Sequence, residues 1–179
     1  MIARTAHVDT FARDNLPPRS QWPEFLFARP EFRYPARMNC ATELLDKMVS
    51  RGFGHRPLIR APEGGCTYTE LYAQANRIAN VLVREMGLKP GNRVLLRGPN
   101  NPMMAACWFA VVKAGGICVA TMPLLRAKEL TEIVTKAELS HALGLHVVLV
   151  LDGQPFGLGQ RVRHDRHRLV LFALQVREE

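Results

Sequence analysis

The chain has 179 residues, which suits one domain with a substantial buried core. Its 47% hydrophobic and 22% charged residues are ordinary for a soluble globular protein. The net charge of +8 suggests nucleic-acid binding, but the excess is spread out: residues 1–143 carry 19 Lys+Arg against 12 Asp+Glu, and residues 144–179 carry 5 against 4. This spread is typical of a solvated surface and argues against a basic nucleic-acid-binding protein, which we keep only as the third hypothesis.

The four cysteines form no CxxC pair and no zinc-type spacing with histidine; they are Cys40, Cys66, Cys107 and Cys118. Reduced thiols in a cytoplasmic protein are the simplest interpretation, and residues 1–14 contain no apolar core of signal-peptide length.

Residues 1–38 are predicted to form an irregular leader. Prolines at five positions prevent long regular elements: Pro17, Pro18, Pro23, Pro30 and Pro35. Five aromatic residues lie between or beside them: Trp22, Phe25, Phe27, Phe32 and Tyr34. Because a disordered tail would be poorer in aromatics, we expect an extended arm whose aromatic rings pack onto the domain surface.

The first helix is predicted to begin at Asn39, a candidate N-cap, and to end at Gly52 and Gly54. One face would be apolar: Ala41, Leu44, Leu45, Met48 and Val49. The segments 57–61 and 66–68 then flank a glycine turn, which indicates a strand pair.

Thr67 and Glu70 have the spacing of a capping box, which predicts a second helix that ends at Gly87. Its inward face would be Leu71, Ala75, Ile78, Leu82, Val83 and Met86. A turn at 89–91 and a strand at 93–97 follow.

Pro102 suits the first position of the next helix, and the apolar run 103–112 predicts burial around most of it, including Met103, Met104, Trp108 and Phe109. The run 103–125 is long enough to span a membrane, but Lys113, Gly115 and Gly116 in its middle favour a buried helix and a buried strand at 117–120.

The segment 126–138 is predicted to be an amphipathic helix with Leu130, Ile133 and Val134 inward. Alternating strands and helices indicate parallel βαβ units, so the fold class is α/β, an incomplete three-layer domain with an unpaired strand edge. We divide the chain into a leader (1–38), a partial α/β domain (39–143) and a divergent tail (144–179). In the tail, 146–151 resembles a strand, 153–159 a loop, 161–168 a basic run with a solvated turn at 164–167, and 169–176 an apolar run.

Several residues are candidates for a site, and each has a structural explanation that we favour. Lys113 could bind phosphate but complements a helix dipole, and Asn100 and Asn101 could contact a ligand but also suit a helix cap. His164 and His167 could bind a metal, but no further Cys or carboxylate cluster converges on them, so we favour a solvated basic turn. The basic residues Arg161, Arg163, Arg166 and Arg168 lack interleaved aromatics. Gly157-Leu158-Gly159 lacks the third glycine of a dinucleotide motif, because position 162 is Val162. We therefore assign no catalytic, cofactor-binding or metal-binding residue.

Several short motifs, in order, carry a resemblance to a known family. Thr67-Tyr68-Thr69-Glu70-Leu71 resembles the first core motif of AMP-forming acyl-CoA synthetases, and Lys113-Ala114-Gly115-Gly116 through Leu125 is similar to the second. Gly91-Asn92-Arg93-Val94 resembles an intervening strand. The leader (11–18) and the segment 39–46 look like the benzoate and 2-aminobenzoate CoA-ligase branch. The resemblance covers about residues 7–143.

The resemblance implies a two-step ligation in which ATP and a carboxylic acid, such as an aromatic acid, form an acyl-adenylate that CoA then attacks. The complete family enzyme uses ATP, Mg and CoA, and it holds the triphosphate with a Ser/Thr/Gly-rich loop that ends in Lys. No such loop occurs in the 179 residues. We therefore expect the N-terminal fragment of a ligase, truncated or frame-shifted after Leu143, which needs no cofactor and is inactive alone. The second hypothesis is a non-enzymatic module that binds a complementary chain or self-associates through its exposed sheet edge.

Overall fold

The computed structural model describes residues 5–35, 37–62, 64–145, 150–151, 154–155, 161–164 and 167–174. Its main sheet has the strand order β4-β3-β5-β9-β8. The five strands are β3 (Arg93–Arg97), β4 (Ile117–Thr121), β5 (His141–Leu145), β8 (Arg161–His164) and β9 (His167–Leu174). The pairs β3–β4, β3–β5 and β5–β9 are parallel, and β8–β9 is antiparallel. The α/β class with parallel βαβ units is confirmed.

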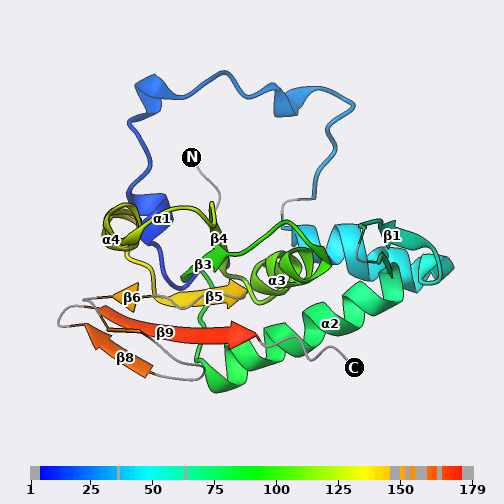
Figure 1. The fold of residues 1–179 in the computed structure, drawn as a ribbon. Helices are drawn as coiled ribbons and strands as arrows, with labels where there is room; N and C mark the ends of the chain where they lie inside the picture. The colour runs from blue at the N-terminus through cyan, green and yellow to red at the C-terminus, as the bar shows by residue number, and fades with distance from the viewer. Residues whose placement is uncertain are drawn as a thin grey trace.

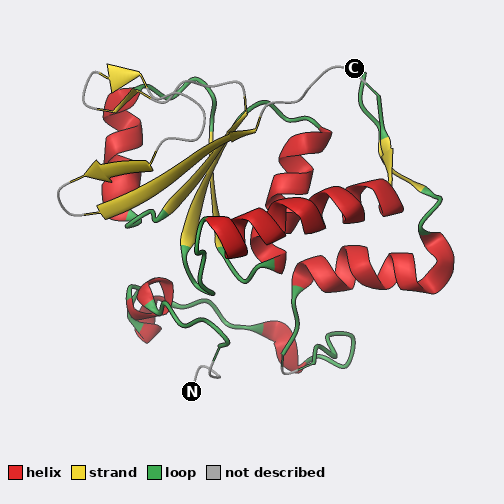
Figure 2. Cartoon of the chain, turned by 90° about the horizontal axis from the view of Figure 1, so that it is seen from below, coloured by secondary structure: helices red, strands yellow, loops and turns green. Residues whose placement is uncertain are grey.

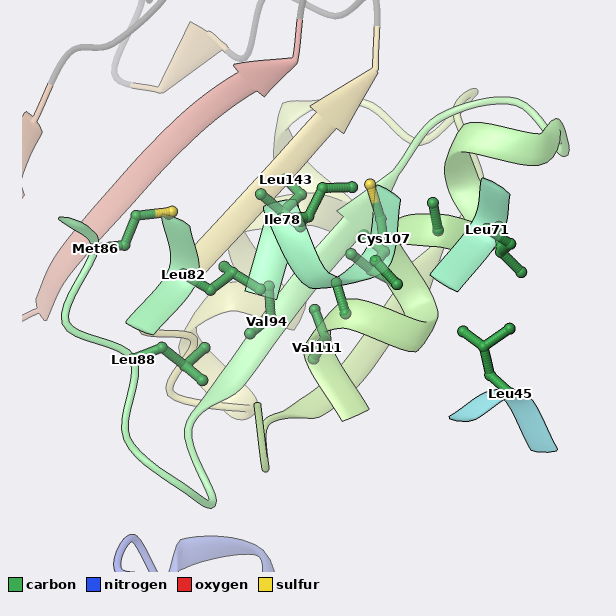
Figure 3. Close-up of a cluster of buried hydrophobic side chains, with 14 residues drawn as sticks. Leu45, Leu71, Ile78, Leu82, Met86, Leu88, Val94, Cys107, Val111 and Leu143 are labelled. Carbon is green, nitrogen blue, oxygen red and sulfur yellow. The ribbon is translucent and has the colours of Figure 1, made fainter. Parts of the chain in front are cut away.

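Helices cover both faces of the sheet, which gives three layers (Figure 2). The helices are α2 (Tyr68–Asn80), α3 (Pro102–Lys113) and α4 (Ala127–Lys136). On one face, Val94 and Leu96 of β3 pack with side chains of α2 and α3 (Figure 3). On the other face, Leu95 packs with Leu130 of α4. Alternate residues of one buried strand thus enter two separate cores, as the period of a strand requires.

The predicted helix boundaries are confirmed by their caps. Glu70 N–H donates to Thr67 Oγ1 at 3.3 Å, and the Glu70 carboxylate accepts from Thr67 N–H at 2.8 Å. A π-helical segment, Val81–Glu85, continues α2 as far as Gly87, which has a φ of +70°. Asn39 Oδ1 accepts from the N–H groups of Ala41 and Thr42 and begins the first helix. Two π-helical segments lie in that helix, at Thr42–Asp46 and Val49–Phe53.

Two predictions of inward side chains were wrong. Leu44 is 57% exposed and Val83 is 47% exposed, although the helical pattern assigned both to the core. Both residues lie in π-helical segments, whose wider turn changes which side chains share a face. Their neighbours Leu45 and Leu82 are buried, as predicted.

The helix α3 is less enclosed than its uniform hydrophobicity predicts. Trp108 is 37% exposed and stacks edge-on against Phe109 at 5.3 Å between ring centroids, whereas Met103, Met104 and Phe109 pack against the core. The helix lies on one face of the sheet, so its outer side has no covering layer among the described residues. Among the described residues, no helix has the length and hydrophobicity that a membrane crossing requires.

The strand pair around the glycine turn is confirmed as β1 (Pro57–Ile59) and β2 (Cys66–Thr67), which are antiparallel. The predicted inward residues of α4 are also confirmed, with Leu130 buried and Ile133 and Val134 packed against it.

The leader is irregular, as its prolines predicted, but the expected packing of its aromatic rings on the domain was wrong. It contains only short helical turns, namely α1 (Phe11–Asp14), Arg19–Gln21 and Leu26–Ala28. Its aromatic rings stack on one another instead of on the domain, with Phe25 and Phe27 at 5.4 Å and Phe32 and Tyr34 at 6.1 Å between centroids. These four rings are 40–64% exposed. Figure 1 shows the leader as an arch that returns to the domain only at its two ends.

The tail is described only in part. The predicted strand 146–151 falls mostly on residues 146–149, which lie outside the described residues; Val150–Leu151 (β6) pairs with Gln154–Pro155 (β7), within the predicted loop 153–159. The basic run 161–168 contributes to two antiparallel strands, β8 (Arg161–His164) and β9 (His167–Leu174), which the sequence did not predict. The residues 165 and 166 of the predicted turn at 164–167 lie outside the described residues.

Candidate functional site

The carboxyl edge of the parallel strands is the first place to look for a site, because open α/β sheets bind ligands there. Two described loops meet at this edge. Residues 98–101 follow β3, and residues 122–125 follow β4, so both lie beside Arg97, the last residue of β3.

Arg97 joins these two loops from a buried position. Only 8% of the residue is exposed, and its Nη2 donates to Pro123 O at 2.6 Å and to Leu125 O at 2.9 Å. Its Nε has no hydrogen-bond partner among the described residues. The guanidinium therefore holds the loop after β4 in place and presents no accessible face to a phosphate.

Asn101 caps α3, as predicted. Its Oδ1 accepts from Met104 N–H at 2.9 Å, and Pro102 occupies the first helical position. Asn100 is exposed in the turn before it. The polar side chains of this loop thus serve the helix terminus, as we favoured from the sequence.

Lys113 has a structural role and lies away from the carboxyl edge. Its Nζ forms an ion pair with Asp46 at 2.7 Å and lies 4.4 Å from the centre of the Tyr72 ring. It therefore ties the end of α3 to the first helix and to α2, in addition to complementing the α3 dipole.

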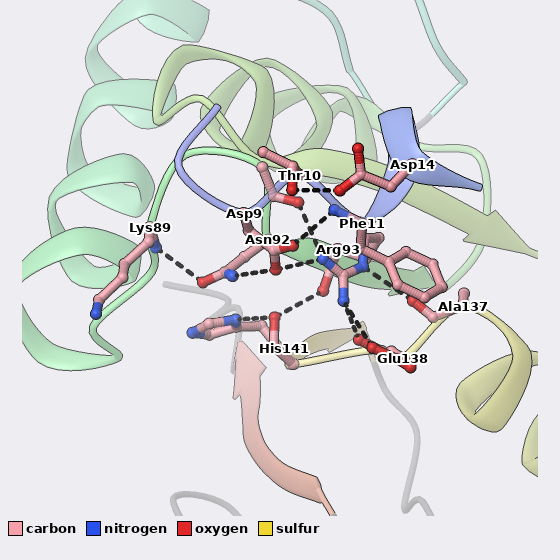
Figure 4. A network of polar contacts seen from close by, with 12 residues as sticks. Asp9, Thr10, Phe11, Asp14, Lys89, Asn92, Arg93, Ala137, Glu138 and His141 are labelled. Carbon is pink, nitrogen blue, oxygen red and sulfur yellow. Dashed lines mark hydrogen bonds and ion pairs between the residues drawn. The ribbon is translucent and has the colours of Figure 1, made fainter. Parts of the chain in front are cut away.

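A polar cluster that the sequence did not predict lies at the amino edge of the sheet (Figure 4). Its centre is Arg93, whose side chain is 7% exposed. The guanidinium forms an ion pair with the Asp9 carboxylate and donates to Ala137 O at 2.9 Å, Glu138 O at 2.7 Å and Gly91 O at 3.2 Å. One buried cation thus joins the leader, the start of β3 and the end of α4.

The leader is held mainly through Asp9 and its neighbours. Asp9 accepts from Phe11 N–H at 3.1 Å and from Asn92 Nδ2 at 2.9 Å, and the Phe11 ring lies 4.4 Å from the Arg93 guanidinium. Burial raises the pKa of Asp9, but the hydrogen bonds from Phe11 N–H, Arg93 and Asn92 outweigh it and leave the pKa below its ordinary value. The Asp9 carboxylate is therefore ionised at neutral pH. A buried arginine at the start of a strand predicts that an acidic side chain pairs with it, but the sequence does not identify that side chain.

His141 belongs to the same edge. Its Nε2 lies 3.1 Å from Met86 O, and its Nδ1 lies 2.8 Å from Ser140 Oγ. Because a carbonyl only accepts, Nε2 carries the proton in the neutral ring. Burial lowers the pKa of His141, against the opposing effect of the Met86 carbonyl. A neutral ring that joins the end of the second helix to β5 is a structural element and not an acid–base catalyst.

A groove of about 460 Å³ lies between α2 and the start of α3. Its walls include Leu71, Ala73, Met103 and Ala106, with Gln74 and Arg77 as polar residues. The groove is open and mostly apolar, and Pro102 and Met103 in its wall directly follow the loop 98–101 of the carboxyl edge.

The four cysteines are free thiols, and the three that are buried or half-buried are unsuited to nucleophilic chemistry: Cys66, Cys107 and Cys118. Burial raises the pKa of Cys107 and of Cys118 to about 12, and burial together with Glu70 raises the pKa of Cys66. A thiol with such a pKa is neutral at physiological pH, so it is a poor nucleophile.

Comparison with protein families identifies the domain. Residues 47–172 match the model of the family described as AMP-binding enzyme, which is more than half of the chain. This chain belongs to the AMP-binding enzyme family.

Two curated relatives illustrate the similarity of this AMP-binding family member. The salicyl-AMP ligase / salicyl-S-ArCP synthetase of Mycobacterium tuberculosis is 39% identical over 108 residues, which are 60% of this chain and 18% of the relative. The benzoate–CoA ligase of Thauera aromatica is 24% identical over 135 residues, which are 75% of this chain and 26% of the relative. The chain thus spans about a fifth to a quarter of the length of these relatives.

Solved structures agree. Apo MatB from Rhodopseudomonas palustris has a TM-score of 0.53 at 31% identity, covering 59% of this chain and 20% of MatB. The anthranilate CoA ligase AuaEII in complex with anthranoyl-AMP has a TM-score of 0.58 at 21% identity, covering 63% and 21% of the two chains, and it supports the fold alone.

The described residues at the carboxyl edge form no built site for the ATP and Mg that the resemblance implies. Arg97 Nη2 donates to two carbonyl oxygens, Arg97 Nε is buried, and Asn101 uses its Oδ1 to cap α3. In the described part of the chain, no three His, Cys, Asp or Glu side chains converge as a metal site would require. His164 and His167 are register partners across β8 and β9. The weak glycine motif at 157–159 and Arg166 lie outside the described residues.

Proposed function

We propose that this chain is scaffold from an ATP-dependent, AMP-forming aryl- or acyl-CoA ligase and that it is inactive by itself. The observation that carries the proposal is the match to AMP-binding enzymes over 47–172, in a chain whose sequence has no Ser/Thr/Gly-rich loop followed by Lys. The chain builds sheet and helices, while the groups that hold triphosphate would come from sequence that it lacks.

The reaction of the complete enzyme explains why such a scaffold cannot act alone. A carboxylate oxygen attacks the α-phosphorus of ATP, the bond to the β-phosphate breaks, and pyrophosphate leaves. The CoA thiol then forms a bond to the acyl carbon, and AMP leaves. Phosphoryl chemistry depends on positioned reactants and neutralised phosphate charge. The buried cations of this chain, Arg93 and Arg97, are engaged by its own backbone and carboxylates.

The substrate class proposed for the complete enzyme is an aromatic carboxylic acid. The similar proteins include a benzoate–CoA ligase and 3-hydroxybenzoate–CoA ligases, and their shared substrate chemistry supports this choice. We also propose a cytoplasmic location and the division into 1–38, 39–143 and 144–179.

The test is pyrophosphate release by the pure 179-residue chain with ATP, Mg²⁺, CoA and either benzoate or 2-aminobenzoate. We expect no release above the rate without acid, while the benzoate–CoA ligase of Thauera aromatica in the same assay provides the positive control. Acid-dependent pyrophosphate or AMP from the pure chain would refute inactivity.

A second candidate is a non-enzymatic module that binds a complementary chain. Two exposed apolar side chains after β4 favour it: Met122 is 63% exposed and Leu124 is 83% exposed. A neighbouring reading frame that encodes the missing phosphate loop would support this candidate. The test is size-exclusion chromatography of the chain mixed with that product, and separate elution would count against it.

A further inference from the structure

The edge strand β4 has backbone groups that no described residue pairs with. Ile117 N–H donates to Asn92 O at 2.8 Å, so this residue faces β3. Because consecutive residues of a strand turn their backbone groups to opposite sides, Cys118 and Ala120 turn theirs away from β3. The described strands pair β4 only with β3, and Ala120 is exposed.

This edge also lacks the features by which sheet edges normally avoid pairing. Such edges carry charged side chains, proline or a bulge. The strand 117–121 contains no charged residue and no proline, and its register with β3 is continuous from Ile117 to Thr121. By contrast, the opposite edge strand β8 contains Arg161, Arg163 and His164 among its four residues. The two edges of the sheet are therefore protected to different degrees against pairing with another strand.

We propose that β4 pairs with β4 of a second copy of this chain, antiparallel about a twofold axis through Val119. In that register Cys118 lies opposite Ala120 of the partner, and both residues have outward N–H and C=O groups. They form the hydrogen-bonded pairs of an antiparallel ladder, and Val119 meets its own copy in the non-hydrogen-bonded site between them.

The side chains suit the same register. Ile117 lies opposite Thr121 of the second copy, and the exposed Met122 lies opposite Gly116, which leaves room for it. No like charges meet along the paired run, because it contains none. The hydrogen bonds from the described leader to the domain go to Pro90, Asn92 and Arg93, and none goes to β4.

Symmetry favours a second β4 over the other edge as the occupant. Pairing β4 with β8 of another copy would leave one β4 and one β8 open at the ends, so it would propagate into filaments. The twofold arrangement closes after two copies and gives a sheet that continues across both. The inference goes beyond the proposed ligase origin and does not depend on it.

The first test is sedimentation velocity over a range of concentrations. We expect a reversible monomer–dimer equilibrium for the native chain. Ala120→Pro removes an outward N–H but leaves the β3–β4 ladder intact, so the dimer should weaken by about tenfold or more. Ala120→Val keeps the N–H and is the matched control, with dimerisation retained. Far-UV circular dichroism of both variants checks that the monomer remains folded.

The second test reports the register. Oxidised glutathione should cross-link Val119→Cys into a covalent dimer in a Cys40→Ser background, because residues opposite each other in the non-hydrogen-bonded site have Cα atoms about 4.5 Å apart. Thr121→Cys, which lies opposite Ile117, should not cross-link. A native chain that stays monomeric at all concentrations would overturn the proposal. Equal dimerisation of the proline variant, or equal cross-linking at 119 and 121, would overturn the pairing.

Discussion

Replacing Asp9 with asparagine tests whether the polar cluster at the amino edge holds the leader to the domain. The substitution removes the carboxylate that pairs with Arg93 and keeps the size of the side chain. A hydrogen bond to a charged group contributes about 1.5–3 kcal/mol, and stranding a fully buried charge costs about 3–5 kcal/mol. Arg93 retains the carbonyls of Ala137, Glu138 and Gly91, and the Asp9 side chain is 27% exposed. These facts favour the lower part of the range, so we expect a loss of about 2 kcal/mol in the free energy of unfolding.

Urea denaturation followed by far-UV circular dichroism measures this loss. For a chain of this size, about 2 kcal/mol corresponds to a fall in Tm of about 4–8 °C. Hydrogen exchange should also accelerate at Val8, whose N–H donates to Pro90 O at 3.0 Å beside the ion pair. Asp14→Asn is the matched control, because that carboxylate pairs with Arg13 on the exposed surface, and we expect no measurable change.

The pH dependence of the stability difference between the native chain and Asp9→Asn tests the direction of the effect. The folded-state pKa of Asp9 is depressed below its ordinary value of 3.8, so its contribution is present above that pH and is lost as the pH falls through the folded-state pKa. The difference in stability between the native chain and Asp9→Asn should therefore shrink in acid. A variant as stable as the native chain at pH 7, with unchanged exchange at Val8, would refute the role of the ion pair.

Three further predictions concern the core, the buried histidine and the thiols. Leu95→Ala should lower the free energy of unfolding by about 2–5 kcal/mol in urea, because Leu95 is fully buried, whereas Leu44→Ala at an exposed site should change it little. His141 has a pKa below its ordinary value of 6.5, so its contribution to stability should be full above pH 6.5 and decline below it; a stability–pH curve unchanged by His141→Gln would contradict this. In the native state, the exposed Cys40 should react with a thiol reagent quickly and the buried Cys107 only upon unfolding, as peptide mapping of the labelled protein can show.

The sequence predicted the elements of the domain because their signals are local. The capping box at Thr67 and Glu70, the Asn101–Pro102 start of α3 and the glycine stop at Gly87 each depend on residues within a few positions. The errors at Leu44 and Val83 came from assuming a period of 3.6 in segments that wind as π-helices. No residue in those segments predicts the change from α-helical to π-helical winding.

The contacts that position the leader could not be predicted, because they join distant parts of the chain. Asp9 meets Arg93 across 84 positions, and Asn39 donates to Val112 O across 73 positions. The five aromatic residues gave a stronger sequence signal than Asp9, yet their rings stack on one another away from the domain. The composition predicts that such rings pack against other apolar groups, but it does not predict which groups these are.

The described cations at three junctions of the fold are engaged by groups of the chain itself: Arg93, Arg97 and Lys113. A site for phosphate chemistry needs cations whose donors remain available to substrate. Here Arg93 is surrounded by three carbonyls and a carboxylate, and Arg97 holds the loop after β4. Lys113 is paired with Asp46. Each of these cations therefore stabilises a junction between elements, and rearranging one to bind triphosphate would open the junction that it holds. The edge strand β4, in contrast, has outward backbone donors and acceptors that a second strand could pair with. Such pairing would break no described contact, whereas binding of triphosphate by one of these cations would.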